Sequence, residues 1–112
     1  MSGKFELKTS NNGEYMFNLI ASNGRVIFTG ETYTERRSAL NGIESVRTNA
    51  PLDERFERRM SSSGQPYFVL KAANGTVIGR SQMYSSTAAM EKGIASVKHH
   101  APDATLVDLT AQ

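Results

Sequence analysis

The sequence contains no cysteine and no tryptophan, and it has only three prolines. Without cysteine the chain cannot form a disulfide, present a thiolate nucleophile or build a cysteine-ligated zinc site. It has no run of about 18 consecutive apolar residues, the length expected of a membrane-spanning helix. Residues 1–6 pass directly into a strand-like alternation and lack the apolar core of a signal peptide. These absences predict a cytoplasmic protein with no membrane partner.

The charge of the chain is also close to balanced. Thirteen lysines and arginines oppose eleven aspartates and glutamates, which gives a net charge of +2. So small an excess neither demands nor excludes an anionic partner. A chain of 112 residues is expected to form one domain, and it can bury about two thirds of its unfolded surface. It therefore needs no disulfide or structural metal to fold. We therefore predict a single domain over residues 1–112.

The most informative feature is a set of residues that occurs twice, 51 positions apart. The first copy has Asn23, Gly24, Gly42, Ile43, Ser45 and Val46, and the second has Asn74, Gly75, Gly93, Ile94, Ser96 and Val97. Tyr33 returns in the same way as Tyr84. The spacing predicts two repeats, one over about residues 3–53 and the other over about residues 54–110.

Each copy combines a strand pattern with a helix pattern. Apolar residues occupy every second position from 15 to 21, the period of a half-buried strand. Asn23-Gly24 then predicts a two-residue type I′ hairpin turn, with Leu19 opposite Phe28 and Ile20 opposite Ile27. Beyond Tyr33, apolar residues at 39, 43, 46 and 50 predict an amphipathic helix that Thr34 caps.

The end of the chain shows how the copies depend on each other. Residues 105–110 have the alternation of a strand, and their counterpart 51 positions earlier opens the second copy. Each unit is therefore β-β-β-α-β, and neither closes without chain from the other. We predict an α+β fold whose two tandem β-β-β-α-β repeats form one continuous, mainly antiparallel sheet. Both helices cover one face, and the protein is a monomer with an internal pseudo-dimer.

Three segments of the second copy carry a family resemblance. They are FVLKAANG at 68–75, SQMYSS at 81–86 and KGIASVK at 92–98, and the first copy repeats the pattern in Asn23-Gly24 and in GIESVR at 42–47. The chain resembles the YegP-like family of small bacterial proteins. The resemblance implies a single sheet from tandem repeats with exchanged terminal strands, and it implies no activity. The first copy departs from the pattern with TERR at 34–37.

Several repeated residues have both a structural and a chemical interpretation. Glycine inside a helix is unfavourable by about 1 kcal/mol relative to alanine, so Gly42 and Gly93 indicate close packing or a ligand against the backbone. Ser45 and Ser96 lack the elbow turn of a serine nucleophile, which favours packing or a hydrogen bond along the helix. The adjacent His99 and His100 point about 100° apart on a helix and do not suit one metal ion. We predict no catalytic residue, metal site or cofactor.

Arginines near the start of the second copy form a candidate basic edge, made of Arg55, Arg58 and Arg59. With Tyr67 and Phe68 as stacking partners, this edge suggests weak nucleic-acid binding. Neighbouring strand residues point to opposite faces, however, and Glu54 and Glu57 interrupt the run. A solvated edge whose charges discourage strand pairing is the alternative.

The sheet face away from the helices is the other candidate contact surface. Alternation places on it Met16, Asn18, Ile20, Ile27, Tyr67, Val69, Lys71 and Ile78. So many apolar side chains left open would mark an interface. Alternatively, loops and the stems of charged side chains cover them.

Three functions follow from these candidates. The first is a small non-catalytic interaction module that binds a protein partner through the open sheet face or an edge strand. The second is weak nucleic-acid binding through the arginines and sheet aromatics. The third is a small-ligand binder or enzyme in the groove between the helices, although the usual base, nucleophile and orienting group are missing.

The shared strand makes a prediction about half of the chain. Residues 1–51 expressed alone should be unfolded or should self-associate, because they lack the chain that closes their sheet and bury too little surface. Circular dichroism and analytical ultracentrifugation measure both properties. A folded monomer of residues 1–51 would contradict the shared-strand interpretation.

Overall fold

The computed structural model describes residues 3–110. Within them the chain forms a seven-stranded sheet and two α-helices, with a short 3₁₀ turn after each helix. The first half contains β1 (Lys4–Thr9), β2 (Tyr15–Ile20), β3 (Val26–Gly30), α1 (Arg36–Asn49) and η1 (Asp53–Arg55). The second contains β4 (Phe56–Met60), β5 (Pro66–Lys71), β6 (Val77–Arg80), α2 (Thr87–His100), η2 (Ala101–Asp103) and β7 (Thr105–Asp108).

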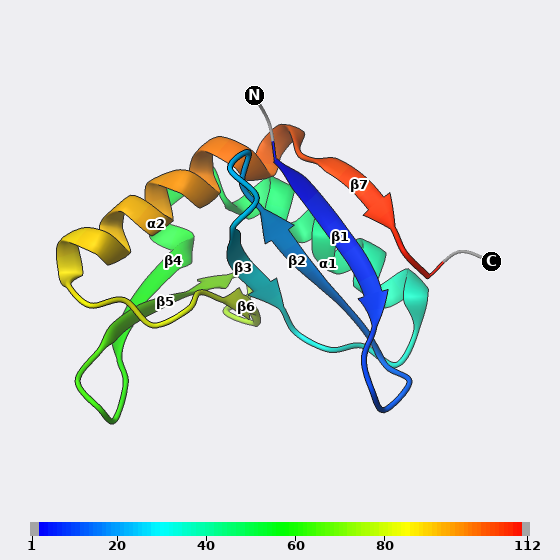
Figure 1. Cartoon of the computed structure of the whole chain (residues 1–112), viewed down its shortest axis with the longest axis horizontal. Coiled ribbons are helices and arrows are strands. Elements are labelled where there is room, and N and C mark those ends of the chain that lie inside the picture. The colour runs from blue at the N-terminus through cyan, green and yellow to red at the C-terminus, as the bar shows by residue number, and fades with distance from the viewer. Residues whose placement is uncertain (1–2, 111–112) are drawn as a thin grey trace.

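The strands lie in the order β4-β5-β6-β3-β2-β1-β7 (Figure 1). Only β7 runs parallel to its neighbour, β1, and the other pairs are antiparallel. Both helices pack on one face of the sheet. The hairpin loops at 10–14 and 61–65 both extend toward the bottom of Figure 1. The prediction of an α+β fold with one continuous sheet is confirmed. Neither helix within residues 3–110 has the length and apolar character needed to cross a bilayer.

A pseudo-twofold axis passes through the centre of the sheet. Thr29 of β3 pairs with Arg80 of β6, which is its own counterpart 51 positions later, and Gly30 pairs with Gly79. The two copies therefore meet edge to edge through equivalent strands. The Glu31 carboxylate lies 3.7 Å from the Arg80 guanidinium across this junction.

The exchanged strand is β7. It follows α2 of the second copy but pairs with β1 of the first, where the Thr105 N–H donates to Gly3 C=O and the Leu109 N–H to Leu7 C=O. The strand in the equivalent place after α1 is β4, and it opens the second copy by pairing with β5. The predicted exchange is thus present, and among residues 3–110 it leaves β1 covered on its outer side and β4 uncovered.

The hairpin turns differ from the sequence prediction. At Ala21–Arg25 the Ala21 N–H donates to Arg25 C=O and the Gly24 N–H donates to Ala21 C=O, while Gly24 has a φ of 87°. This is a type I turn followed by a glycine bulge, because Asn23 does not take the positive φ that a type I′ turn requires. The same bonds recur in the hairpins at 10–14, 61–65 and 72–76.

A second irregularity changes the register beyond these turns. Leu19 lies opposite Phe28 as predicted, but Ile20 lies opposite Val26, so that Ile27 is an extra residue. The second copy repeats this shift at Ile78. A bulge turns the extra side chain toward the other face of the sheet. The predicted pairing of Ile20 with Ile27 is therefore wrong.

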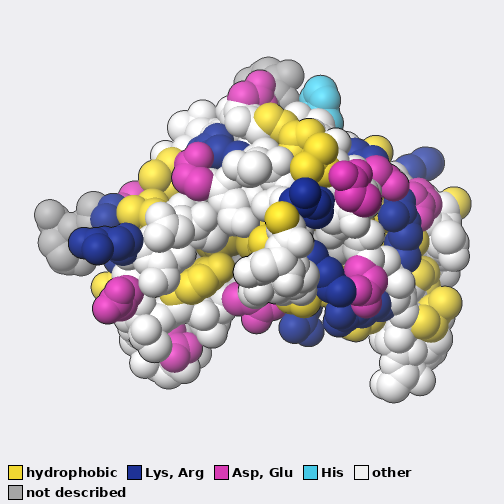
Figure 2. Space-filling model, turned by 180° about the vertical axis from the view of Figure 1, so that it is seen from behind, with side chains coloured by type: hydrophobic (Ala, Val, Ile, Leu, Met, Phe, Trp, Pro, Cys, Tyr) yellow, Lys and Arg dark blue, Asp and Glu magenta, His cyan; other side chains and the backbone are white. Residues whose placement is uncertain are grey.

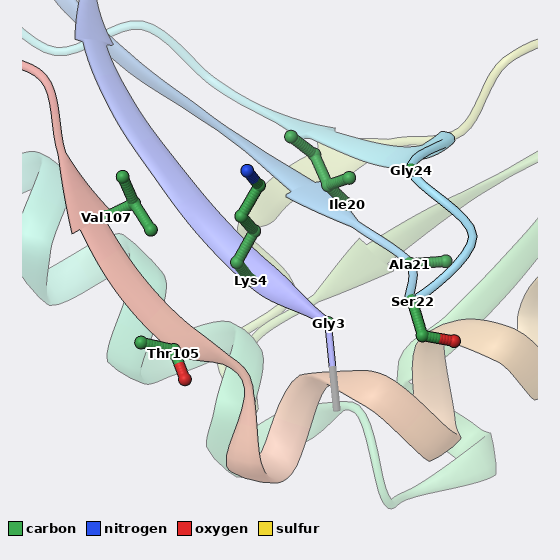
Figure 3. Close-up of a pocket in the computed structure, with 8 residues that line it drawn as sticks. All are labelled: Gly3, Lys4, Ile20, Ala21, Ser22, Gly24, Thr105 and Val107. Atoms are coloured by element: carbon green, nitrogen blue, oxygen red, sulfur yellow. The ribbon is translucent and has the colours of Figure 1, made fainter. Parts of the chain in front are cut away.

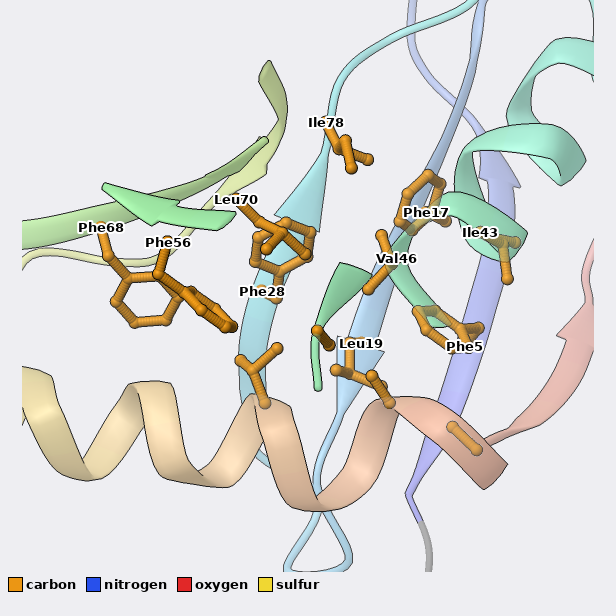
Figure 4. Packing of buried hydrophobic residues seen from close by; sticks show 14 of the residues in the cluster. Phe5, Phe17, Leu19, Phe28, Ile43, Val46, Phe56, Phe68, Leu70 and Ile78 are labelled. Atoms are coloured by element: carbon orange, nitrogen blue, oxygen red, sulfur yellow. The ribbon is translucent and has the colours of Figure 1, made fainter. Parts of the chain in front are cut away.

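Phenylalanines of the two copies build the core between sheet and helices (Figure 4). The Phe5 ring packs edge-on against Phe17 at 6.0 Å, and their counterparts Phe56 and Phe68 do the same at 5.6 Å. A cation covers each pair: Arg47 lies over Phe5 and Lys98, 51 positions later, lies over Phe56. Such aromatic and cation–π contacts each contribute on the order of 1 kcal/mol beyond area burial.

The helix glycines make room for a tyrosine of their own copy. A Cβ added at Gly42 would lie 2.5 Å from Tyr33 Oη, and one added at Gly93 would lie closer still to Tyr84 Oη. Close packing therefore explains both glycines, and the neighbour is this tyrosine. Burial raises the pKa of both hydroxyls; the Glu31 charge raises that of Tyr33 further, and a hydrogen bond with the Gln82 side chain partly offsets the rise for Tyr84.

The repeated serines stabilise the helix ends. The Asn49 side-chain amide donates to Ser45 C=O at 2.8 Å and to its hydroxyl at 3.2 Å. His100, the counterpart of Asn49, places Nδ1 2.8 Å from Ser96 C=O and 3.2 Å from the Ser96 hydroxyl. At the other end of α2, Ser86 accepts from the Ala89 N–H. The predicted cap at Thr34 is wrong, because α1 begins after Glu35 without a side-chain cap.

These contacts predict the effect of filling the helix glycines. Gly93→Ala should lower the free energy of unfolding by about 1–3 kcal/mol, because the clash with a half-buried tyrosine outweighs alanine's better helix propensity. Gly42→Ala should be destabilising by less, since its added Cβ would have slightly more room. Urea unfolding measures both. Equal or greater stability of Gly93→Ala would contradict this packing.

Candidate functional site

The helix-free face of the sheet is less apolar than the sequence predicts. Six of the eight candidate residues lie on strand positions that face away from the helices: Met16, Asn18, Ile20, Tyr67, Val69 and Lys71. Ile78 is in the core at 4% exposure, and Ile27 packs against that core. The prediction that Ile27 and Ile78 belong to the contact surface is wrong because the bulge turns both toward the helices.

Charged neighbours cover much of what remains. Val69 has no exposed surface, although it lies on the helix-free face between Glu57 of β4 and Arg80 of β6. Glu57 binds both Lys71 and Arg59, and these contacts, that of Lys71 first, lower the pKa of its carboxyl. Ile20 is 8% exposed and Asn18 accepts a hydrogen bond from Thr29. The open face is thus an ordered polar surface.

The arginines of the candidate basic edge all have partners within the chain. Arg55 lies in η1, outside the strand, and donates to Asn49. Arg58 binds Glu91 of α2 and Asp53, whereas Arg59 points to the other face and binds Glu57. Cationic and anionic side chains are interspersed over the face in Figure 2. The three arginines therefore do not form a free basic stripe.

Each helix forms one groove with a hairpin turn of the other copy. The α1 groove, about 260 Å³, is lined by Tyr33, Ser38, Asn41, Gly42, Ser45, Ala72, Asn74, Thr76, Val77 and Ile78. The α2 groove, about 750 Å³, is lined by Asn23, Arg25, Val26, Ile27, Gln82, Tyr84, Ala89, Lys92 and Gly93. Most of these positions correspond across the 51-residue spacing. The third functional hypothesis placed its groove between the helices, and neither of these grooves lies there.

A third hollow, about 420 Å³, lies beside the 22–24 turn (Figure 3). Lys4 stands between Ile20 of β2 and Val107 of β7 on the same side of the sheet. Among residues 3–110, the lining of this hollow has one cation, Lys4, and no second ionisable side chain. Such a lining lacks the convergent polar groups of a catalytic site.

One of the two histidines, His100, has a structural role. His100 Nδ1 faces the Ser96 carbonyl, which can only accept, so this nitrogen carries the proton and Nε2 accepts from the Ser22 N–H at 3.4 Å. The bond joins the end of α2 to the 21–25 turn of the first copy. Within residues 3–110, no three histidine, aspartate or glutamate side chains gather closely enough to hold a metal ion.

The two outer strands of the sheet offer different edges. Ser61 bonds to Gln65 at the hairpin end, so alternation directs the backbone groups of Glu57 and Arg59 toward β5 and those of Phe56, Arg58 and Met60 outward. The equivalent outward groups of β1 are those that receive β7. The β4 edge is therefore the unoccupied counterpart of the β1 edge.

The β7 strand is held in place from the helix side. Asp108 binds Arg36 of α1, and its Oδ1 accepts from the Thr110 N–H at 2.8 Å and hydroxyl at 2.6 Å. Thr110, first, and then Arg36 lower the pKa of the Asp108 carboxyl to about 2. A contact between repeat one and the strand of repeat two thus depends on this ionised carboxylate.

Known proteins share this arrangement. The protein family described as "Domain of unknown function (DUF1508)" matches the chain twice, over residues 10–57 and 61–108. The chain belongs to the DUF1508 family. The first DUF1508 match ends at residue 57, just inside β4, and the second ends at residue 108, the last residue of β7. This correspondence agrees with the overlap of the two copies at β4.

Relatives match the chain over almost its whole length. The chain is 51% identical over 110 residues to a UPF0339 protein of Shewanella oneidensis, covering 98% of this chain and all of that protein. It is 48% identical over 110 residues to UPF0339 protein YegP of Escherichia coli, with the same coverage. The resemblance to YegP-like proteins is thereby confirmed.

Solution NMR structures of two relatives have the same fold. The UPF0339 protein of S. oneidensis aligns with a TM-score of 0.91 at 50% identity, over 97% of this chain and 92% of that one. The E. coli yegP protein of unknown function aligns with a TM-score of 0.94 at 47% identity, over all of this chain and 97% of that one.

The Asp108 contacts predict a pH dependence. Because its pKa is lower folded than unfolded, where it is near 4, this carboxylate contributes stability above pH 4 that is lost as pH falls toward 2. The difference in unfolding free energy between the wild type and Asp108→Asn should be largest near pH 6. It should shrink toward pH 2, as measured by urea unfolding. A difference independent of pH would contradict the assigned contacts.

Proposed function

We propose that this protein is a non-catalytic interaction module that binds an extended segment of a partner protein along the free edge of β4. The observation that carries the proposal is the asymmetry of the sheet. The outer side of β1 holds a parallel strand, β7, whereas β4, its counterpart 51 positions later, is uncovered within the described residues. The molecule itself thus contains an example of the binding mode.

The register of β7 on β1 indicates which segment fits. Leu106 lies opposite Phe5 and Asp108 lies opposite Leu7. The counterparts of Phe5 and Leu7 on β4 are Phe56 and Arg58. A parallel segment in the same register would place an apolar residue beside Phe56 and an acidic residue, two positions later, beside Arg58. Main-chain hydrogen bonds would supply affinity and these two side chains specificity.

A charged side chain on the β4 edge also disfavours pairing with arbitrary strands. Arg58 carries a charge at the centre of the strand, and Glu91 and Asp53 hold it in place. Charges on an edge strand discourage association with arbitrary strands. An acidic residue of a partner at the matching position would join this network through Nη1 of Arg58, because Glu91 and Asp53 accept from Nε and Nη2. This selectivity distinguishes β4 from a merely exposed edge.

A peptide tests the proposal directly. The probe is PDATLVDLT, the sequence of residues 102–110, titrated into the ¹⁵N-labelled full chain. Amide shifts should concentrate on Phe56, Arg58 and Met60, whose backbone groups point outward. A peptide with asparagine at the position of Asp108 should bind about fivefold more weakly or worse, since it loses a charge-assisted hydrogen bond.

A proline variant supplies the control. Met60→Pro removes an outward N–H that no described strand of the chain uses. It should therefore leave the fold intact while weakening the binding of the peptide. Shifts at residues 105–110 in place of β4 would show that the peptide competes for the β1 edge and would overturn the proposal. So would the absence of shifts at about millimolar peptide, a concentration at which even weak strand addition is visible.

A further inference from the structure

The two grooves have the same frame and different charges. In each, a tyrosine packs against a helix glycine, and a hairpin turn of the other copy forms the opposite wall. The backbone around Asn74-Gly75 repeats that around Asn23-Gly24, with the same turn bonds. A difference in what the grooves can bind must therefore come from the side chains that have diverged.

At three diverged positions, the second member of each pair named below is more positively charged than the first. Asn41 of α1 is replaced by Lys92 in the α2 groove, and Thr76 of the turn is replaced by Arg25. The third is Glu31, whose charge raises the pKa of Tyr33 and whose counterpart is the neutral Gln82. The exchange gains two positive charges and removes one negative charge beside the tyrosine. Among the lining residues the α2 groove is thus two charges more positive, and the carboxylate near Tyr33 has no counterpart near Tyr84.

The two cations of the α2 groove have no anionic partner among residues 3–110. Seven other basic side chains lie within 4 Å of a carboxylate: Arg36, Arg47, Arg58, Arg59, Lys71, Arg80 and Lys98. Arg25 and Lys92 form no such pair, and both are exposed on opposite walls of one cavity. Two basic side chains that converge without a carboxylate favour an oxyanion between them.

The remaining lining suits the body of a small molecule. Tyr84, Val26 and Ile27 provide an aromatic and aliphatic surface beside the cations, and Gly93 also lines the groove. The volume of about 750 Å³ lies within the range of about 300–1,000 Å³ typical of small-molecule sites. The same surface is reduced in the α1 groove, whose volume is about 260 Å³.

We infer that the α2 groove binds a small molecule that joins an oxyanion, a phosphate or carboxylate, to a planar or apolar body. Arg25 and Lys92 hold the oxyanion, with the guanidinium offering two parallel donors and the ammonium a point charge. The body lies against Tyr84 and Ile27. The α1 groove, with Asn41 and Thr76, does not take such a ligand. This site is separate from the β4 edge, and the two proposals stand or fall independently.

The experiment is an NMR titration of the ¹⁵N-labelled full chain with three probes. Phenyl phosphate and benzoate carry the two kinds of oxyanion, and benzyl alcohol carries the same ring without a charge. Phenyl phosphate or benzoate should shift the amides of Arg25, Lys92 and Gly93, and their relative affinities identify the preferred oxyanion. Benzyl alcohol should bind about tenfold more weakly or worse, because it cannot use the two cations.

The α1 groove supplies the matched control in the same molecule. Gly42 and Asn41 should show no comparable shifts. Arg25→Thr with Lys92→Asn gives the α2 groove the side chains of the α1 groove, and it should reduce affinity at least about tenfold. These residues are exposed, so unchanged spectra of the core are expected and confirm the fold of the variant.

The reciprocal variant and the salt dependence complete the test. Asn41→Lys with Thr76→Arg should create oxyanion binding at the α1 groove, weaker because its cavity is smaller. Binding at the α2 groove should weaken as salt is raised from about 20 to 200 mM, as expected of exposed charges. Equal shifts in both grooves of the wild type, an unaffected Arg25→Thr/Lys92→Asn variant, or no shifts at about 10 mM probe would overturn the inference.

Discussion

The structure depends on the junction of β3 with β6. Thr29 pairs there with its own counterpart Arg80, so the two copies share one sheet and neither presents an edge to solvent at the centre. Every other repeated contact is arranged around this axis, including the two aromatic pairs with their covering cations. A repeat of about 50 residues buries too little surface to fold well alone, and the junction doubles the core available to each.

The same arrangement explains why the ends of the sheet differ. A sheet with two equivalent halves would carry a strand outside both β1 and β4. One chain can supply only one, because the segment after α1 is already used as β4. Pseudo-symmetry therefore creates an asymmetry of edges, and the proposed partner site follows from it. Divergence of the side chains creates the second asymmetry, between the α1 and α2 grooves.

The fold was largely predictable because duplication makes each copy evidence for the other. The 51-residue spacing predicted the two repeats, the shared strand and the equivalent positions of Gly42 and Gly93. The bulge was not predictable, because Asn23-Gly24 fits both a type I′ turn and a type I turn with a glycine bulge. A separate bulge, which restores the register after this turn, turned Ile27 and Ile78 off the contact surface. The grooves join residues of opposite copies, and only the charges at positions 25 and 92 could have drawn attention to one of them.

The central claim is that the two copies form one cooperative unit through the junction and the exchanged strand. Native-state hydrogen exchange measures this most directly, through the amides of Leu19 in β2 and Leu70 in β5. Both should exchange only by global unfolding, with equal opening free energies and equal denaturant dependence. An opening of Leu70 or Leu19 that requires several kcal/mol less than the other would show two independently unfolding repeats and contradict it.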